Sequence, residues 1–232
     1  MIIGKIAKSD SHINYVCQIF GPREVEVMPS SPDYAFGRFV RVAIRAGQED
    51  EDHEAAVMLG HSNEPVTYAI GVIYDTILVN PQFGALGPRL SNETQVELFS
   101  PDYISEKAVL TYIMILGIMV MRQSPESAPE VLSVMHGVPL LSLDLGSEIE
   151  TMTDEEVQAF HFFKDVVVDS DQQHPYLHMG YLPHIIGQRN SLLPMVTLRI
   201  IDQLEHLFPQ NLALLSIVKR NFAWRLKVET TG

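Results

Sequence analysis

Cysteine, basic charge and long apolar runs are all scarce in this sequence. Cys17 is the single cysteine in 232 residues, so a disulfide within the chain and a metal site built on several thiolates are both excluded. The longest apolar run, Val109 to Met121, has thirteen residues, whereas a membrane-spanning helix needs about 20. With no membrane span and no apolar N-terminal stretch long enough for a signal peptide, we expect a protein of the cytoplasm.

The sequence also lacks the motifs of several common enzyme classes. It contains no Gly-x-x-x-x-Gly-Lys-Ser/Thr for binding a nucleoside triphosphate and no Gly-x-Gly-x-x-Gly for a dinucleotide. Neither Gly-x-Ser-x-Gly nor His-Glu-x-x-His is present, so the common hydrolase and zinc-protease signatures are missing as well. These absences favour a protein that is not an enzyme and that needs no cofactor.

Charge is distributed unevenly along the chain. The net charge is −13, and residues 105–186 carry three basic against twelve acidic side chains, which gives −9. Residues 187–232 carry six basic against three acidic side chains, which gives +3 and makes this the one basic stretch. Nucleic-acid binders are usually basic because phosphate contacts supply much of their affinity. The distribution therefore favours self-association or a protein partner over direct contact with nucleic acid.

The first part of the chain has the pattern of β-strands. Short β-branched segments alternate with turn signals over residues 1–80, and Tyr68–Val79 is the longest of them. Gly71 inside this segment predicts a bulge or a bend, as the corner of a small barrel requires. We therefore predict an α+β protein, with a small N-terminal β-barrel domain over residues 1–100 and a mainly α-helical domain over residues 101–232.

Several helices are expected in the second part. Ser100–Met121 is predicted to be a helix, with Ser100 or Asp102 as its cap. A further helix is expected to begin at Thr153–Glu156, where acidic residues follow a capping threonine. Residues 191–208 and 211–227 have apolar residues at helical spacing and predict two amphipathic helices. Between these segments, Val138–Leu143 resembles a short strand.

Three histidines suggest an alternative function. His174, His178 and His184 lie within eleven residues, and histidines four apart on a helix can bind zinc. Prolines and a glycine interrupt this segment, however, so histidines of a polar loop or of the interior are the better explanation. A metal-dependent hydrolase or nuclease that uses this segment is the first alternative to a non-catalytic protein.

The C-terminal segment Lys219–Lys227 interleaves cations with aromatic residues. Arg220, Trp224 and Arg225 could place a basic amphipathic helix against an acidic partner, a neighbouring subunit or an anionic surface. In the simpler interpretation, Trp224 anchors a terminal helix to its own core while the cations complement the end of the helix. A nucleic-acid-binding module that uses this helix is the second alternative function.

A glycine- and proline-rich segment follows the predicted strands at residues 80–91. It is too apolar for a flexible linker, and its prolines and glycines fix a loop shape at low ordering cost. We predict that it forms an interface, although it could equally seal the end of the barrel. The interface residues expected here are Asn80, Pro81, Phe83, Gly87, Pro88 and Arg89.

Three blocks in which glycine precedes a β-branched strand carry a family resemblance. Ile3–Ile6, Phe36–Val42 and Ile70–Asp75 resemble the repeated blocks of the HAS-barrel, the small barrel shared by HerA-type DNA translocases and the catalytic subunits of ATP synthase. The resemblance covers about residues 1–80. The tract from Asn80 to Ser105 is similar to the segment that comes after the barrel in cyanobacterial proteins of this kind.

In that family the barrel helps to assemble ring-shaped ATPases and presents a docking surface, for example to a nuclease. The ATPase core normally comes after the barrel, but no such motif is present in this chain, so the resemblance implies no catalytic residue. It implies a non-catalytic assembly or docking protein. Its barrel would associate with itself as a homo-oligomer, or would bind a HerA-type ATPase or another protein.

Overall fold

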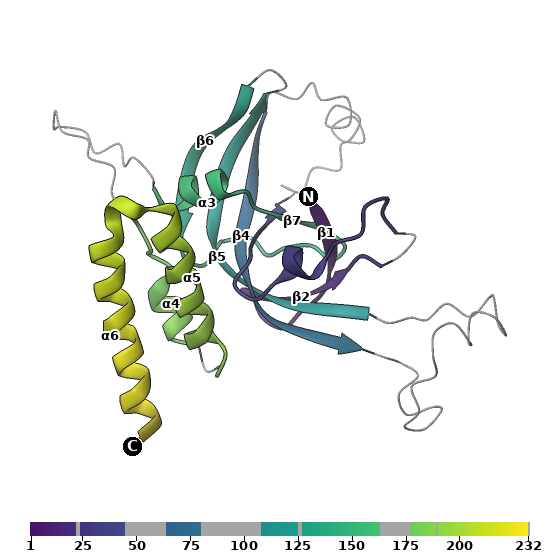
Figure 1. The fold of residues 1–232 in the computed structure, drawn as a ribbon. Helices are drawn as coiled ribbons and strands as arrows, with labels where there is room; N and C mark the ends of the chain where they lie inside the picture. The colour runs from purple at the N-terminus through teal and green to yellow at the C-terminus, as the bar shows by residue number, and fades with distance from the viewer. Residues whose placement is uncertain are drawn as a thin grey trace, which may run out of the picture.

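The structure is a computed structural model, and it describes residues 1–21, 24–44, 64–79, 108–124, 127–162, 177–188 and 190–231. The strands are β1 (Ile2–Ser9), β2 (Asn14–Ile19), β3 (Phe39–Ala43), β4 (Pro65–Val79), β5 (Ala108–Ser124), β6 (Ser127–His136) and β7 (Glu148–Thr151). The helices are η1 (Ser31–Tyr34), α3 (Asp154–His161), α4 (Leu182–Ile186), α5 (Leu193–Leu207), η2 (Pro209–Asn211) and α6 (Leu212–Thr231). Strands occupy the N-terminal two-thirds and helices follow (Figure 1), so the predicted α+β class is confirmed.

The seven strands form one antiparallel sheet that curls into a nearly closed ring. Their order is β2-β1-β7-β3-β4-β5-β6, and β2 also pairs with β5. One edge of β5 is shared between two neighbours, since residues 110–114 pair with β2 and residues 117–124 pair with β6. The other edge of β5 pairs with β4 along almost its whole length. Ring closure satisfies backbone groups that an open sheet would leave at its edges.

The prediction of a helix over Ser100–Met121 is wrong where the structure describes that segment, because residues 108–124 form strand β5. Its apolar residues are buried on both faces, and such a run resembles a buried helix because neither periodicity is visible in it. Strands therefore continue beyond the expected boundary at residue 100. The predicted strand at Val138–Leu143 is also wrong, since these residues belong to the loop between β6 and β7.

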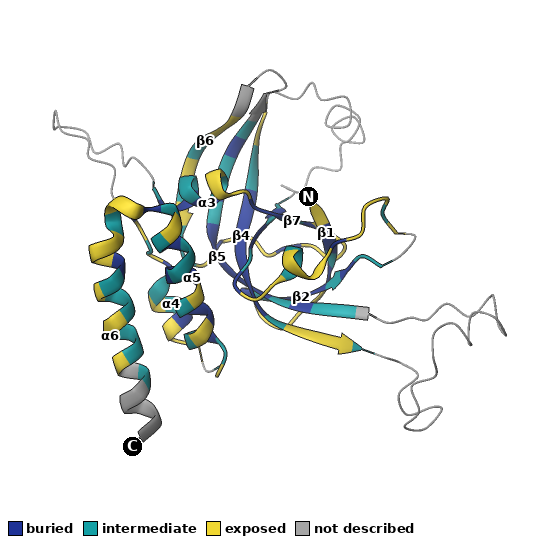
Figure 2. Ribbon diagram, viewed as in Figure 1, coloured by how far each residue is buried: buried dark blue, intermediate teal, exposed yellow. Residues whose placement is uncertain are grey.

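The two faces of the sheet contribute to two separate cores. On β4, Ala69 and Ile73 belong to the core inside the ring, whereas Ile70 and Val72 belong to the core between the sheet and the helices. In Figure 2 the dark blue of buried residues runs along the middle of β4 and β5. The interior core consists of Ile3, Ile6, Ile13, Tyr15, Cys17, Ile19, Val40, Val42, Ala69, Ile73, Ile113, Ile115, Leu143 and Ile149.

Two glycines have clear structural reasons. The pairing between β4 and β5 shifts register between Ile70 and Gly71, so the predicted irregularity at Gly71 is confirmed. At Gly4, a Cβ atom would lie 2.2 Å from the carbonyl oxygen of Gln18 on the neighbouring strand. Any side chain at Gly4 would therefore push β1 and β2 apart.

The helices begin and end where their sequences suggest. The Thr153 side chain accepts a hydrogen bond from the Glu156 amide (3.3 Å), and the Glu156 carboxylate accepts one from the Thr153 amide (2.9 Å). This capping box confirms the predicted start of α3. The two helices predicted at the C-terminal end are also confirmed as α5 and α6, with the short η2 between them. Only α5 has its apolar residues gathered on one buried face, since α6 also carries exposed apolar residues. No helix within the described residues is long and apolar enough to cross a membrane.

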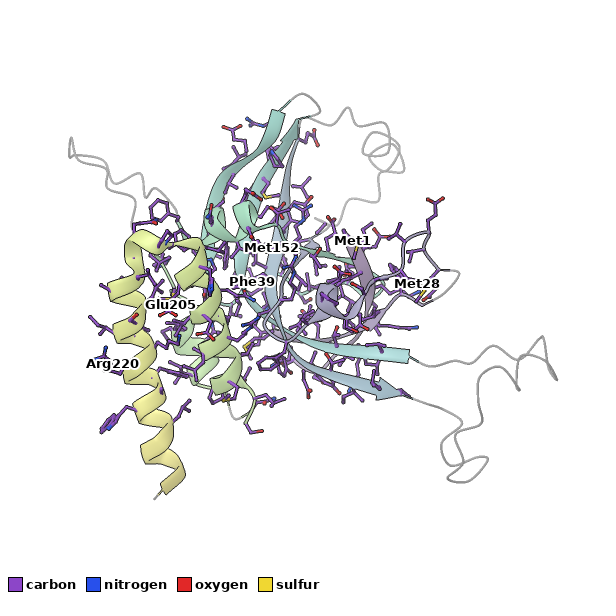
Figure 3. All side chains as sticks on the ribbon, viewed as in Figure 1. Met1, Met28, Phe39, Met152, Glu205 and Arg220 are labelled. Atoms are coloured by element: carbon purple, nitrogen blue, oxygen red, sulfur yellow. The ribbon has the colours of Figure 1, made fainter. Side chains whose placement is uncertain are left out.

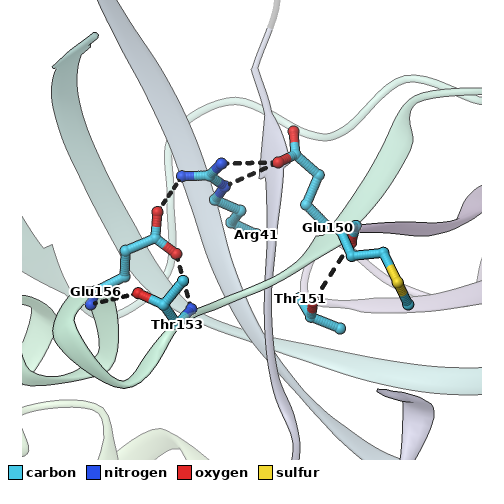
Figure 4. Close-up of polar contacts among 6 residues, drawn as sticks. Arg41, Glu150, Thr151, Thr153 and Glu156 are labelled. Atoms are coloured by element: carbon cyan, nitrogen blue, oxygen red, sulfur yellow. Dashed lines mark hydrogen bonds and ion pairs between the residues drawn. The ribbon is translucent and has the colours of Figure 1, made fainter. Parts of the chain in front are cut away.

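One arginine connects the sheet to α3 (Figure 4). Arg41 on β3 donates to the Glu150 carboxylate on β7 at 2.7 Å and also forms an ion pair with Glu156 of α3. Its guanidinium lies 4.8 Å from the centre of the Tyr68 ring on β4. Burial lowers the pKa of Arg41, but the hydrogen bonds and charges of its acidic partners outweigh this and raise the pKa overall. The side chain thus holds three strands and α3 together.

Candidate functional site

The predicted interface has one part that the structure describes. The loop residues Asn80, Pro81, Phe83, Gly87, Pro88 and Arg89 lie outside the described residues, as does His174. Arg220 and Trp224 lie on α6, and the backbone of Arg225 is part of the same helix, although its side chain is not among those described. The site is therefore built from α6 and from the surfaces that share its chemistry.

α6 packs on the rest of the protein with one side only. Leu215 is fully buried, and Lys219 forms ion pairs with Asp202 (2.6 Å) and Glu205 (2.8 Å) of α5. Figure 3 shows Glu205 between the two helices, whereas Arg220 points away from the body of the protein. α6 is thus held to α5 along one face, and its opposite face is left to solvent.

The outward side of this helix, which we call the α6 face, combines apolar and basic side chains. Trp224 is 66% exposed, and Leu214 and Ile217 are also about half exposed. Arg220 and Asn221 are exposed between them. The interpretation in which Trp224 anchors α6 to its own core is therefore wrong. The residues of the α6 face are Leu214, Ile217, Arg220, Asn221 and Trp224.

A second exposed apolar surface lies in the loop between β6 and β7, residues 137–147. Leu140 is 92% exposed, and Leu141 and Leu145 are also exposed. Asp144 and Glu148, the first residue of β7, are exposed acids, and the loop contains no basic residue. Large exposed apolar side chains that gather in one place commonly mark interaction sites.

This loop is held in shape by hydrogen bonds to the ring. His12 Nε2 donates to the Pro139 carbonyl (2.6 Å), and the Leu143 amide donates to the Tyr15 hydroxyl (3.0 Å). The Gly146 amide donates to the Ile6 carbonyl (2.8 Å). Because the backbone is fixed in this way, the exposed leucines can bind a partner with little further loss of conformational entropy.

Sequence reasoning missed the 137–147 loop as a surface. Its apolar residues resembled a strand, and strand residues would have been expected to pair and to pack. The signal that could have identified it is the pair Asp144 and Gly146, because aspartate and glycine favour turns. In the structure Gly146 has φ = 81°, which is the left-handed region.

Three of the described histidines, His136, His161 and His178, form a packed cluster beside α3. The ring of His136 stacks on that of His178 at 4.5 Å and lies 4.4 Å from the ring of Phe160. His161 and Tyr181 are fully buried beside them. The cluster joins β6 and α3 to the segment that leads into α4.

Hydrogen bonds define which ring nitrogens of this cluster carry protons. Gly180 donates its amide to His136 Nδ1 (3.0 Å), so His136 Nε2 carries the proton and donates to the Phe160 carbonyl (2.9 Å). His161 Nδ1 donates to the Val157 carbonyl (2.7 Å), so its Nε2 accepts from the Tyr181 hydroxyl (2.7 Å). Both rings are neutral and fully hydrogen-bonded.

Burial reinforces this neutral state. It lowers the pKa of His161 to about 3 and that of His136 to about 4, because a charged imidazole loses its hydration in the interior. The pKa of His184 is also lowered by burial, and its Nε2 donates to the Ile115 carbonyl at 3.0 Å.

These contacts do not make a metal centre. Of the three histidines considered as ligands, the two that are described have different neighbours, since His178 stacks on His136 whereas His184 bonds to β5. Within the described part of the chain, no group of three or more His, Cys, Asp or Glu side chains has an arrangement that could hold a metal ion. The observed histidines are explained by packing and hydrogen bonding.

Cys17 lies inside the ring. It is fully buried, and burial raises the pKa of its thiol far above the ordinary value. A thiol that is buried in apolar surroundings with a raised pKa is expected to be unreactive.

Comparison with known proteins assigns a family but no activity. No curated protein matches this sequence. The model of a domain of unknown function, DUF8166, matches residues 1–231, which is nearly the whole chain. The chain, with its ring of strands and the helices packed on it, therefore belongs to the DUF8166 family.

Proposed function

We propose that this chain is a non-catalytic assembly protein, and that it associates with a second copy of itself. In this association the α6 face of one copy binds the 137–147 loop of the other. The observation that carries the proposal is the presence of two exposed apolar surfaces with opposite charge, one with Arg220 and one with Asp144 and Glu148.

Charge favours contact between the α6 face and the 137–147 loop over contact between two α6 faces. Residues 1–186 carry 10 basic and 26 acidic side chains, a net charge of −16, whereas residues 187–232 carry +3. Two α6 faces placed against each other would bring Arg220 of one copy close to Arg220 of the other. Like charges at an interface are unfavourable. The loop offers apolar contact together with acids, which complements the α6 face.

The arrangement of the fold supports contact between copies over contact within one. The loop is bonded to β1 and β2, and α6 packs on α5. In Figure 1, α6 lies at one side of the molecule and β1 and β2 lie toward the other. Because the two surfaces lie toward different sides of the molecule, the contact is head-to-tail and would join copies into a closed ring or an open chain.

Charge-introducing substitutions on each surface test the proposal. The double variant Ile217→Glu/Trp224→Glu is expected to reduce the native mass measured by light scattering to that of a monomer, and Leu140→Glu/Leu145→Glu is expected to do the same. All four side chains are exposed, so the fold should be retained, which circular dichroism checks.

The matched control is Val27→Glu, an exposed apolar residue outside both surfaces. It is expected to keep the wild-type mass. If the wild type is itself a monomer, or if only one of the two surfaces matters, the proposed pairing is wrong. A HerA-type ATPase as partner remains a prediction from the resemblance, and its copurification with a monomeric chain would favour it instead.

A further inference from the structure

A cleft lies between α5, the start of α3 and the turn that leads into β3. Its volume is about 330 Å³, which is at the lower end of the range for small-molecule sites. Phe39 and Met152 contribute its buried apolar floor, and Figure 3 shows both where the sheet meets the helices. Its polar and charged lining residues are Arg38, Asp154, Arg199, Asp202, Gln203 and His206.

Two arginines in this cleft are not engaged by acidic side chains. Within the described part of the chain, neither Arg38 nor Arg199 forms an ion pair or a side-chain hydrogen bond. The Nε atom of Arg38 is buried and has no hydrogen-bond partner there. A buried donor without a partner is unfavourable, which marks the Arg38 guanidinium as a group that still needs an acceptor.

The turn before β3 brings the two guanidiniums to the same cleft. Gly37 has φ = +83°, which side-chain-bearing residues rarely adopt, and a Cβ atom there would lie 2.5 Å from Arg199 Cγ. Gln203 donates its side-chain amide to the Gly37 carbonyl at 3.0 Å. Arg199 therefore packs on the residue that precedes Arg38, and the turn is tied to α5 on the same side.

The acids near the cleft leave this positive charge available. Asp202 is paired with Lys219 at 2.6 Å, so its charge is already compensated. Asp154 lies in the first turn of α3, where the helix dipole stabilises a negative charge. Hydrogen bonds from Ser30 lower the pKa of Asp33, and the charge of Arg38 makes a smaller contribution in the same direction.

His206 also lines the cleft. Its Nδ1 proton is already donated to the Asp202 carbonyl at 2.7 Å, so the two arginines are the donors available to an anion. Guanidinium groups bind carboxylates and phosphates with two parallel hydrogen bonds. The apolar floor suits the short carbon skeleton of such a ligand.

We propose that this cleft binds a small organic oxyanion, a molecule whose carboxylate or phosphate group is held by Arg38 and Arg199. The short apolar part of the ligand lies against Phe39 and Met152. This site is separate from the α6 face and from the 137–147 loop, so it does not depend on self-association.

Thermal unfolding with two probe anions tests the site. Sodium phosphate and sodium succinate are compared with sodium chloride at the same ionic strength. At a concentration about 100 times the Kd, either anion is expected to raise the Tm by about 5 °C or more. A rise with phosphate identifies a phosphate site, and a rise with succinate identifies a carboxylate site.

Variants at each arginine show whether the effect comes from the cleft. Arg38→Gln and Arg199→Gln are each expected to weaken binding at least tenfold by isothermal titration. Arg199 is exposed and glutamine keeps the Cγ that packs on Gly37, so this variant should fold. Arg122→Gln, whose arginine pairs with Glu130 at the surface, is the control. The proposal is overturned if neither anion exceeds chloride, or if the Arg199→Gln variant binds as the wild type does.

Discussion

Replacing Arg41 with methionine should destabilise the protein far more than the same replacement at Arg122. The Arg41 side chain is 12% exposed and links Glu150 and Glu156, whereas that of Arg122 is 40% exposed and pairs with Glu130. Methionine retains the apolar stem in both cases and removes the charge. The two substitutions therefore differ mainly in how far the partner carboxylates are removed from water.

The expected magnitude follows from this difference in burial. Breaking a fully buried ion pair by removing one partner costs about 3–5 kcal/mol, and exposed pairs contribute about 0–1 kcal/mol. The Glu156 side chain is 13% exposed and that of Glu150 is 29% exposed, so Arg41→Met should cost about 3 kcal/mol. For a chain of this size that lowers the Tm by about 6–12 °C.

Denaturant and thermal unfolding, followed by circular dichroism, measure the effect. Arg122→Met is expected to change the free energy of unfolding by less than about 1 kcal/mol. Equal effects of the two substitutions would refute the reasoning, because the Arg41 network would then contribute no more than a surface pair. A double-mutant cycle with Glu156→Gln would separate the ion pair from the loss of packing.

Three further predictions concern buried groups and the helix cap. The pKa values of His161 and His136 are lowered to about 3 and about 4 in the folded protein, against about 6.5 in the unfolded chain. As the pH falls, the unfolded chain therefore takes up protons first. The stability that these two groups contribute is complete above pH 6.5 and is lost as the pH falls below that value. His161 alone should lower the free energy of unfolding by about 2 kcal/mol between pH 7 and pH 5. The His161→Phe variant should be less stable than the wild type at pH 7, but its free energy of unfolding should fall less between pH 7 and pH 5. A free energy of unfolding that does not depend on pH in this range would contradict the prediction. Cys17 should react with a thiol reagent only at the rate of global unfolding, and rapid modification of the native protein would show that it is not sealed in the core. Thr153→Ala should lower the free energy of unfolding by about 1 kcal/mol through loss of the α3 cap, whereas an unchanged denaturation midpoint would show that the cap contributes nothing.

Local patterns predicted the elements whose own sequence determines them. α5 and α6 carry apolar residues at helical spacing, and α3 begins with a capping threonine followed by acids, so their positions could be read directly. β5 could not, since a strand buried on both faces has the same composition as a buried helix. Its true state depends on pairing with β4 and β2, which are distant in sequence.

The candidate sites were predicted in part. The composition of the C-terminal segment indicated a basic amphipathic helix, but only packing shows that Trp224 faces solvent. Arg38 and Arg199 are separated by most of the chain, and nothing in either local sequence suggests that they share a cleft. Gly37, the glycine before β3 that permits their approach, stood out in the sequence only as part of a family resemblance. That resemblance to the HAS-barrel remains a prediction.

The most direct test of the proposed self-association is the native mass of the wild-type protein, measured by light scattering over a range of concentrations and salt. The account predicts a mass that is a multiple of 26.1 kDa and that falls toward 26.1 kDa on dilution or at high salt, because opposite charges contribute to the contact. A mass of 26.1 kDa at every concentration and salt would contradict it.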